Sequence, residues 1–264
     1  MCVPIICRDE RISNTARNMT GPAPFLFRLG NKLYKGAFPI YRPLYAAFKT
    51  YVDRAERRLL ARHLSPGAVA VDAGANIGIY SQFLARCVGT AGMVHSFEPE
   101  PENFARLRAA VASLPNVRVN RLALSDKTGD SLLYLCQQLN VDHRAYPTEG
   151  ETRRSVSIRS ITLDDYFKPG ERVDLIKMDI QGYELHALRG ANRVLEDNPD
   201  IKLLVEFWPY GLKQAGANWS DLIAALEQKH MIVQEVADEG LIPFDSGARR
   251  ESPDWYVNLF ASRT

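Results

Sequence analysis

The segment Val69-Ala-Val-Asp-Ala-Gly-Ala-Asn-Ile-Gly-Ile-Tyr80 sets the architecture of this 264-residue chain. Its first three residues are apolar and two of them are β-branched, which predicts a buried strand. Gly74 and Gly78 flank Asn76 and predict a turn, and the apolar residues of 77–88 then recur at helical spacing. Such a turn opens backbone amides to a ligand, because glycine has no Cβ and a helix N-terminus presents free N–H groups.

The side chains around this turn indicate which ligand it binds. Asn76 stands where the dinucleotide fingerprint has its middle glycine, and the carboxylate of Asp72 would repel a pyrophosphate. Glu98 ends the next predicted strand, where a carboxylate suits the two hydroxyl groups of a ribose. An ammonium group near Asp72 and a ribose at Glu98 describe S-adenosylmethionine better than a nicotinamide dinucleotide. A structural turn that binds no ligand is the remaining alternative.

Strands and helices alternate along the rest of the chain, which predicts a parallel α/β sheet. Strands are predicted at 69–71, 92–97, 116–124, 173–179, 201–207, 231–236 and 255–260. Helices are predicted at 77–88, after Pro99 and Pro101, and at 163–167, 183–195 and 219–228. The last two strands have no clear helix between them, so the last one is expected to run antiparallel. Two more strands, 131–136 and 155–159, are expected to pair with each other.

The loop after the third strand completes the predicted cofactor site. Ser125 and Asp126 follow that strand, which lies beside the first two in such a sheet, so an adenine would rest there. The predicted cofactor-binding residues are therefore Asp72, Gly74, Asn76, Gly78, Glu98, Ser125 and Asp126.

The first 63 residues differ from the rest in charge. They hold twelve lysines and arginines against four acidic residues, a local charge of +8 in a chain whose total is +2. We predict an N-terminal arm and helical cap over 1–63, with a helix break near Pro39 and Pro43, and a cofactor-binding domain over 64–264. The basic helices are interpreted as a substrate platform and lid, as an interfacial membrane helix, or as a solvated face of a packed helix.

Composition favours a cytoplasmic location. The small net charge gives no argument for a nucleic-acid partner. The four cysteines, Cys2, Cys7, Cys87 and Cys136, lack metal-ligand spacing, which indicates reduced thiols. The first apolar run is too short for a signal peptide, and no stretch reaches the roughly 18 apolar residues of a membrane span. The basic helices also allow an alternative, in which the cytoplasmic protein binds peripherally to the inner membrane face.

Several motifs resemble those of the FkbM-type methyltransferases. They are Val-Asp-Ala-Gly-Ala-Asn-Ile-Gly (71–78), Phe-Glu-Pro (97–99), Ile-Lys-Met-Asp-Ile-Gln-Gly-Tyr-Glu (176–184), Leu-Arg-Gly-Ala (188–191) and Val-Glu (205–206). The resemblance covers about residues 35–262, and 176–191 is its family-specific part. It implies a class I S-adenosylmethionine-dependent enzyme with a Rossmann-like seven-stranded sheet, which O-methylates a hydroxyl group of a sugar or natural product. Gln181 departs from the family, which usually has an acid there.

Methyl transfer to a hydroxyl group needs in-line geometry and a group that accepts the hydroxyl proton. Asp179 and Glu206 end the fourth and fifth parallel strands, and Glu184 lies one turn into the following helix. These carboxylates are candidates for the base, or for ligands of Mg²⁺, with Asp179 and Glu206 as the metal pair. The alternative is that Glu184 or Glu206 orients the backbone and Lys177.

The polar loop 137–154 supplies the remaining catalytic candidates. Its Asp142-His143-Arg144 segment also resembles a recurrent family element. His143 has the intrinsic pKa of a base, and Arg144 beside it would position a sugar or an anionic substrate. A merely solvated histidine is the alternative.

These features favour an O-methyltransferase that uses S-adenosylmethionine and acts on a small-molecule or saccharide acceptor. One rival is a protein of the same fold that binds the cofactor without turnover. The three carboxylates at 179, 184 and 206 argue against it. The other rival is a methyltransferase that acts on a lipid-linked saccharide at the membrane surface.

Overall fold

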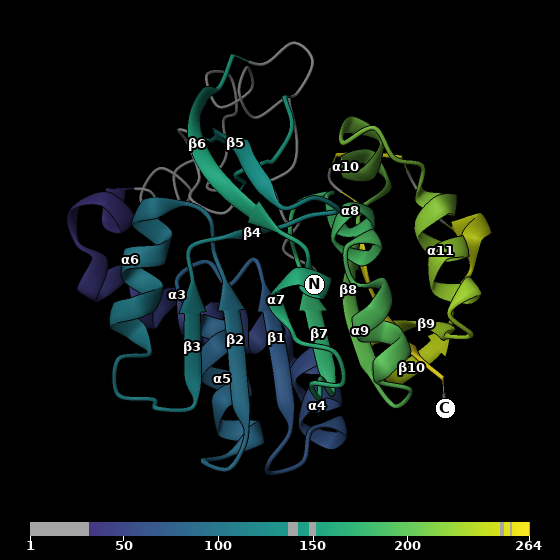
Figure 1. The fold of residues 1–264 in the computed structure, drawn as a ribbon. Coiled ribbons are helices and arrows are strands. Elements are labelled where there is room, and N and C mark those ends of the chain that lie inside the picture. The colour runs from purple at the N-terminus through teal and green to yellow at the C-terminus, as the bar shows by residue number, and fades with distance from the viewer. Residues whose placement is uncertain (1–31, 137–141, 148–151, 249–250, 254, 264) are drawn as a thin grey trace.

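The structure, a computed structural model, describes residues 32–136, 142–147, 152–248, 251–253 and 255–263. Its centre is an eight-stranded sheet in the order β10-β9-β11-β8-β7-β1-β2-β3 (Figure 1). These strands are β1 (Val69–Ala73), β2 (Met93–Phe97), β3 (Val117–Asn120), β7 (Leu175–Met178), β8 (Lys202–Phe207), β9 (Ile232–Ala237), β10 (Gly240–Pro243) and β11 (Val257–Ser262). The strands from β8 to β3 are parallel, and β11 runs antiparallel to β8 and β9. The predicted α/β fold with an antiparallel last strand is confirmed.

The sheet has one strand more than the seven expected. The additional strand is β10, which forms an antiparallel hairpin with β9 at the sheet edge. Its four residues end in Pro243 and give no alternating apolar run, so the sequence carried little signal for it. A proline is tolerated there because an edge strand leaves one row of N–H groups unpaired in any case.

Helices cover both faces of the sheet (Figure 1). On one face, α4 (Arg54–His63) and α5 (Ile79–Val88) bury Leu60 and Leu84 in a cluster with Ala70. The other face buries Val71 and Ile176 under α7 (Leu163–Tyr166), α8 (Glu184–Arg189), α9 (Asn192–Asp197) and α11 (Trp219–Gln228). Neighbouring residues of β1 thus enter different clusters, because strand side chains alternate between the two faces. The remaining helices are α3 (Phe38–Val52), α6 (Pro101–Ala110), α10 (Pro209–Gln214) and the short 3-10 turn η2 (Ser246–Ala248).

A second, three-stranded sheet lies above the carboxyl ends of the parallel strands (Figure 1). Its order is β4 (Ala123–Leu124), β6 (Arg154–Ile161) and β5 (Gly129–Leu135). The predicted pairing of 131–136 with 155–159 is confirmed as the antiparallel β5–β6 ladder. The prediction of a single strand at 116–124 is wrong. β3 ends at Asn120, which lies opposite Phe97 at the end of β2, and the chain then forms β4, which pairs with β6 in the second sheet.

The helix expected at 183–195 is also two helices. α8 ends at Arg189, and Gly190 packs so closely on the neighbouring loop that an added Cβ would lie 2.0 Å from the Ser125 carbonyl oxygen. The chain restarts as α9 at Asn192. The helix α10 was not predicted.

The N-terminal helices differ from prediction in where they break. α3 contains both Pro39, which lies in its first turn, and Pro43, which removes one backbone hydrogen bond near its start. The break comes at Asp53, between α3 and α4. Most of the predicted arm, with Cys2 and Cys7, lies outside the described residues, whereas Cys87 is a free thiol within them. Within the described ranges, no helix has the length and apolar character needed to cross a bilayer.

Candidate active site

The glycine turn lies at the carboxyl end of β1 and connects it to α5. Gly74 has φ +75°, and a Cβ on it would lie 2.0 Å from the Asp179 carbonyl oxygen. Gly74 therefore lets the end of β1 approach the end of β7, which brings the predicted cofactor turn beside the predicted catalytic acid. Asn76 (φ +49°) and Gly78 (φ +85°) complete the turn before α5 begins.

Glu98 holds this turn from the end of β2. Its carboxylate accepts hydrogen bonds from the backbone N–H groups of Asn76 (2.8 Å) and Glu100 (2.9 Å). Burial raises the pKa of Glu98 to about 8, although both backbone hydrogen bonds oppose that shift. Each carboxylate oxygen has two acceptor positions, so acceptor capacity for ribose hydroxyls remains beside the two amides.

Asp72 lies beneath the turn and is fully buried. Its Oδ2 accepts a hydrogen bond from Ser81 Oγ at 2.7 Å, and Lys177 Nζ lies 3.8 Å from its Oδ1. Burial raises the pKa of Asp72, while Lys177 and Ser81 act in the opposite direction. Oδ1 makes no hydrogen bond among the described residues, and the cation that faces it is the Lys177 ammonium group.

Lys177 joins Asp72 to the predicted catalytic edge. Its ammonium group lies 3.6 Å from Asp179 Oδ2 and 4.7 Å from the centre of the Tyr80 ring. Lys49 of α3 lies 5.9 Å from the same ring and pairs with Asp53 at 2.7 Å. The N-terminal helix therefore reaches the carboxyl edge of the sheet through a lysine. The sequence analysis did not identify Lys49 or Tyr80 as site residues. Lys177 did carry a sequence signal, because a lysine inside the buried strand 173–179 indicates a buried anionic partner.

The side-chain amide of Gln181 lies between the carboxylates of Asp179 and Glu206. Gln181 Nε2 donates to Asp179 Oδ1 at 3.0 Å and lies 3.5 Å from Glu206 Oε2. Gln181 has φ +59°, and its carbonyl oxygen accepts a hydrogen bond from Tyr146 Oη at 2.6 Å. The Asp179 side chain is 31% exposed and Glu206 is buried, so Asp179 is the carboxylate that a substrate can reach.

Glu184 turns away from this pair. It is fully buried, and its Oε1 accepts hydrogen bonds from the backbone N–H groups of Ile180 (3.0 Å) and Gly182 (3.2 Å). Burial raises the pKa of Glu184 to about 7. The side chain thus shapes the turn that carries Asp179 and Gln181, which is the orienting role weighed for it above.

The loop candidates His143 and Arg144 are both engaged within the protein. His143 Nδ1 accepts the Cys136 backbone N–H at 3.1 Å, and burial lowers the pKa of His143 to about 4. The lone pair that a base needs is therefore already used. Arg144 donates to both oxygens of the buried Asp142 (2.8 and 3.2 Å) and lies over the Trp208 ring. Other parts of this loop, including Asn140, lie outside the described residues.

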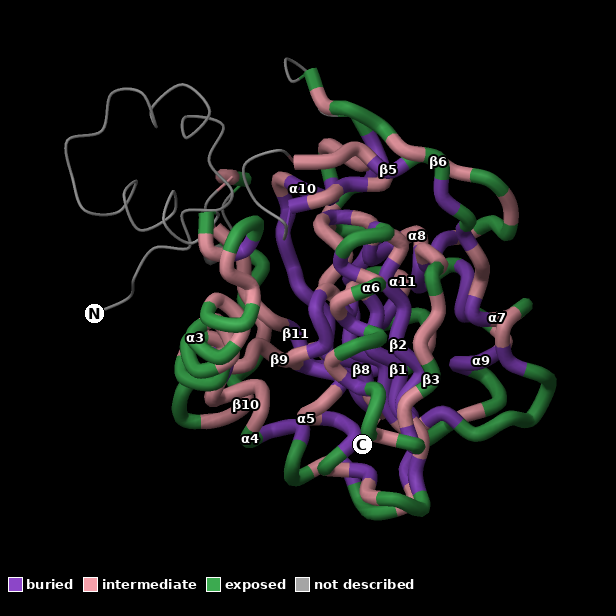
Figure 2. The backbone as a smooth tube through the Cα atoms, turned by 90° about the vertical axis from the view of Figure 1, so that its left-hand side faces the viewer, coloured by how far each residue is buried: buried purple, intermediate pink, exposed green. Residues whose placement is uncertain are grey.

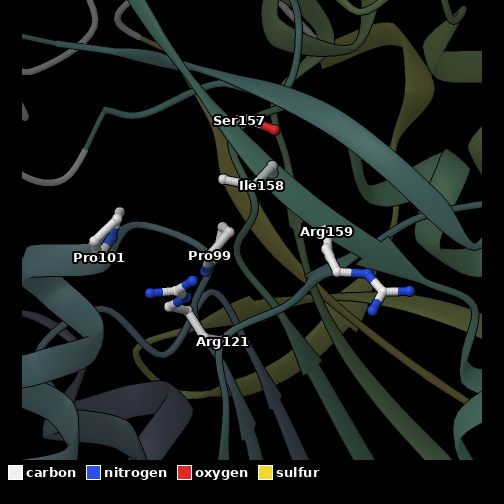
Figure 3. Close-up of a pocket in the computed structure, with 6 residues that line it drawn as sticks. All are labelled: Pro99, Pro101, Arg121, Ser157, Ile158 and Arg159. Carbon is white, nitrogen blue, oxygen red and sulfur yellow. The ribbon is translucent and has the colours of Figure 1, made fainter.

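A cavity of about 260 Å³ lies beside Pro99 and Pro101, at the turn between β2 and α6 (Figure 3). It is lined by Pro99, Pro101, Arg121, Ser157, Ile158 and Arg159. The three β6 residues gave no sequence signal, because they reach this position only when the small sheet folds over the β2–α6 turn. The predicted adenine residues lie elsewhere along the same edge: Asp126 accepts hydrogen bonds from His186 (3.1 Å) and Ser125 (3.3 Å).

Among the described residues, no group of three or more histidine, cysteine or acidic side chains is placed to hold a metal ion. Between Asp179 and Glu206, the Gln181 amide presents a hydrogen-bond donor where a cation would have to sit.

Comparison with known proteins gives consistent matches. A family model described as the Methyltransferase FkbM domain matches residues 72–231. Hexuronic acid methyltransferase AglP of Haloferax volcanii is 31% identical over 144 residues, which cover 53% of this chain and 56% of that protein. The 31-O-demethyl-FK506 methyltransferase FkbM of Streptomyces tacrolimicus is 45% identical over 76 residues, 27% of this chain and 29% of that protein. This chain thus spans about half or less of the length of these two relatives.

Among solved structures, an rRNA methylase from Streptococcus thermophilus aligns with a TM-score of 0.47 and 11% identity. The alignment covers 78% of this chain and 93% of that one.

Proposed function

The chain belongs to the FkbM methyltransferase family, and on that premise we propose that it transfers a methyl group from S-adenosylmethionine to a hydroxyl group of a sugar or natural-product acceptor. The observation that carries this proposal is the contact between the glycine turn and the end of β7, where a Gly74 Cβ would lie 2.0 Å from the Asp179 carbonyl oxygen. This contact brings a cofactor turn and a reachable carboxylate to one point. The two relatives are named for a hexuronic acid and for a demethylated FK506, which supports an oxygen acceptor.

The cofactor would lie along the carboxyl edge of β1 and β2. Glu98 would accept the ribose hydroxyls, and Asp72 Oδ1 would face the ammonium group. We place the adenine in the cavity beside Pro99 and Ile158, which measures about 260 Å³ and is lined by apolar side chains together with Arg121 and Arg159. When bound, S-adenosylmethionine supplies a methyl group activated by a sulfonium.

The protein's own residues would handle the acceptor hydroxyl. Transfer forms an oxygen–carbon bond and breaks the sulfur–carbon bond, and the hydroxyl proton must leave. Asp179 is the proton acceptor in this proposal, because it is partly exposed whereas Glu206 is buried. Lys177, 3.6 Å away, offsets its negative charge, and Gln181 fixes its direction. Holding the hydroxyl oxygen in line with the methyl group would supply a further part of the rate gain.

Magnesium is not needed in this arrangement. Glu184 accepts hydrogen bonds from backbone N–H groups, and the Gln181 side-chain amide donates a hydrogen bond between the carboxylates of Asp179 and Glu206. We therefore expect transfer that chelators do not inhibit.

Replacement of Asp179 by asparagine tests the proton-acceptor role. The variant keeps the shape and the Gln181 contact region but removes the base, so turnover should fall about 10²–10⁴-fold while S-adenosylmethionine affinity changes little. The measurement is methyl transfer from labelled cofactor to hexuronic acids and macrolides, beside calorimetric cofactor binding. Asp200→Asn, at an exposed position, is the matched control. Equal turnover of Asp179→Asn and wild type would exclude Asp179 as the base, and cofactor binding without transfer to any hydroxyl acceptor would favour the non-catalytic rival.

A further inference from the structure

The helix α3 exposes an apolar stripe. None of its 15 residues is buried, and Figure 2 shows it at the margin of the molecule. Four large side chains are exposed on it: Ile40 (58%), Leu44 (60%), Phe48 (45%) and Tyr51 (72%). Their spacing of four, four and three residues places them on one helical face, along about 16 Å of the axis. We call these four residues the α3 stripe.

The rest of α3 is anchored to the protein by other side chains. Arg42 donates to Gln82 of α5 at 2.7 Å, and Lys49 pairs with Asp53 and lies over Tyr80. The α3 stripe therefore takes no part in these contacts that hold the helix in place. An exposed row of large apolar side chains of this kind marks a candidate interaction surface.

Basic residues lie at both ends of the stripe. Lys32 and Lys35 are exposed before it, and Arg58 and Arg62 are exposed on α4, beyond the break at Asp53. The two acids of 32–63 point elsewhere: Asp53 is buried, and Glu56 accepts a hydrogen bond from Asn258. Asp238 of another segment lies at the α4 end: its carboxylate pairs with Arg54, and its backbone carbonyl oxygen accepts a hydrogen bond from Arg58.

From this arrangement we propose that the α3 stripe docks on an anionic lipid bilayer. In interfacial helices, an apolar face inserts among the acyl chains and flanking lysines and arginines contact the lipid phosphates. The α3 stripe and the basic residues at its ends would bind in the same way. A second copy of the chain fits less well, because a two-fold contact through the stripe would bring these basic ends toward each other. The +8 charge of residues 1–63 acts in the same direction as the flanking residues. This inference does not depend on methyl transfer.

Vesicle sedimentation of the full chain tests the proposal. The protein should sediment with vesicles of phosphatidylcholine containing about one-third phosphatidylglycerol, and less with phosphatidylcholine alone or at high salt. In the double variant Leu44→Glu/Phe48→Glu, the partition coefficient should fall more than about tenfold, since two apolar side chains lose their burial and two charges oppose insertion. Leu132→Glu/Ile232→Glu is the matched control, because these residues are similarly exposed (47% and 58%) on β5 and β9.

The outcomes separate the possible occupants of the stripe. Retained binding by the control variant and loss by the stripe variant support the bilayer. No sedimentation of wild type with anionic vesicles overturns the proposal, as does equal loss in both variants. A dimer seen by light scattering that the stripe variant converts to monomer, with vesicle binding unchanged, would assign the stripe to a second copy. Circular dichroism and cofactor binding of the variants confirm that they fold.

Discussion

At the scale of single residues, the carboxylate edge depends on one amide. Gln181 places its Nε2 donor 3.0 Å from Asp179 and 3.5 Å from Glu206, so two acids share a neutral partner. An acid at this position, which the resemblance to the family leads one to expect, would bring a third negative charge to the same point. Like charges at this distance repel unless a proton or a cation joins them.

The variant Gln181→Glu should therefore acquire a dependence on divalent cations. Its melting temperature should be below that of wild type without metal and should rise when millimolar Mg²⁺ is added, because three carboxylates provide oxygen ligands. The wild-type melting temperature should not respond. Gln228→Glu, at an exposed position of α11, controls for added surface charge. A wild-type protein stabilised by Mg²⁺ as strongly as Gln181→Glu would contradict the role given to the amide.

At the scale of elements, the turn between β7 and α8 is the part that presents Asp179. Glu184 accepts two backbone N–H groups inside it, and Gln181 adopts a left-handed conformation that is uncommon for a side chain of its size. Gly182 (φ +93°) passes so close to Gly211 that a Cβ would lie 2.4 Å from its backbone. The segment 142–147 supports this turn from above through the Tyr146 hydroxyl.

Loss of that hydroxyl should loosen the turn. Tyr146→Phe removes the hydrogen bond to the Gln181 carbonyl and leaves a buried acceptor without it, so the free energy of unfolding should fall by about 1–3 kcal/mol. Turnover should fall several-fold more than cofactor affinity, because the turn carries Asp179 and not the ribose site. Chemical denaturation and steady-state kinetics measure both, with Tyr134→Phe on β5 as control. An unchanged turnover in Tyr146→Phe would show that the turn holds its shape without this support.

At the scale of the whole molecule, buried glutamates make stability depend on pH. The folded-state pKa of Glu98 is raised to about 8 and that of Glu184 to about 7. Between their unfolded value of 4.5 and these values, the folded protein binds more protons, so stability falls as pH rises. His95 and His143, with pKa values lowered to about 4, oppose this slope up to pH 6.5, their unfolded value.

The free energy of unfolding should therefore decline from pH 6.5 to 8, where Glu98 and Glu184 lose their protons and the two histidines no longer oppose the slope. The decline should be on the order of a few kcal/mol at most and should be smaller in Glu98→Gln, in which the contribution of Glu184 remains. Denaturant titrations at several pH values measure it. Stability that rises over this interval would show that Glu98 is ionised in the folded protein well below pH 8.

The sequence predicted the parts of this molecule that local patterns control. The glycine turn, the acid that ends β2 and the antiparallel last strand follow from runs of neighbouring residues. The division of 116–124 between two sheets and the cavity wall at Ile158 depend on pairing between distant segments, which no short pattern contains. The hydrogen bonds of Glu184 and His143 with backbone N–H groups could not be predicted either, because the partner of a side chain depends on the position of the backbone around it.

Calorimetric titration of S-adenosylhomocysteine into the protein at pH 8.5, where Glu98 is largely ionised, tests the cofactor site most directly. Wild type should bind, and so should Glu227→Ala, a control at an exposed position of α11. In Glu98→Ala the affinity should be about ten- to a hundredfold weaker, since hydrogen bonds to a charged group are lost. No binding by the intact protein, or equal affinity of Glu98→Ala and wild type, would contradict the placement of the cofactor at the β1 turn.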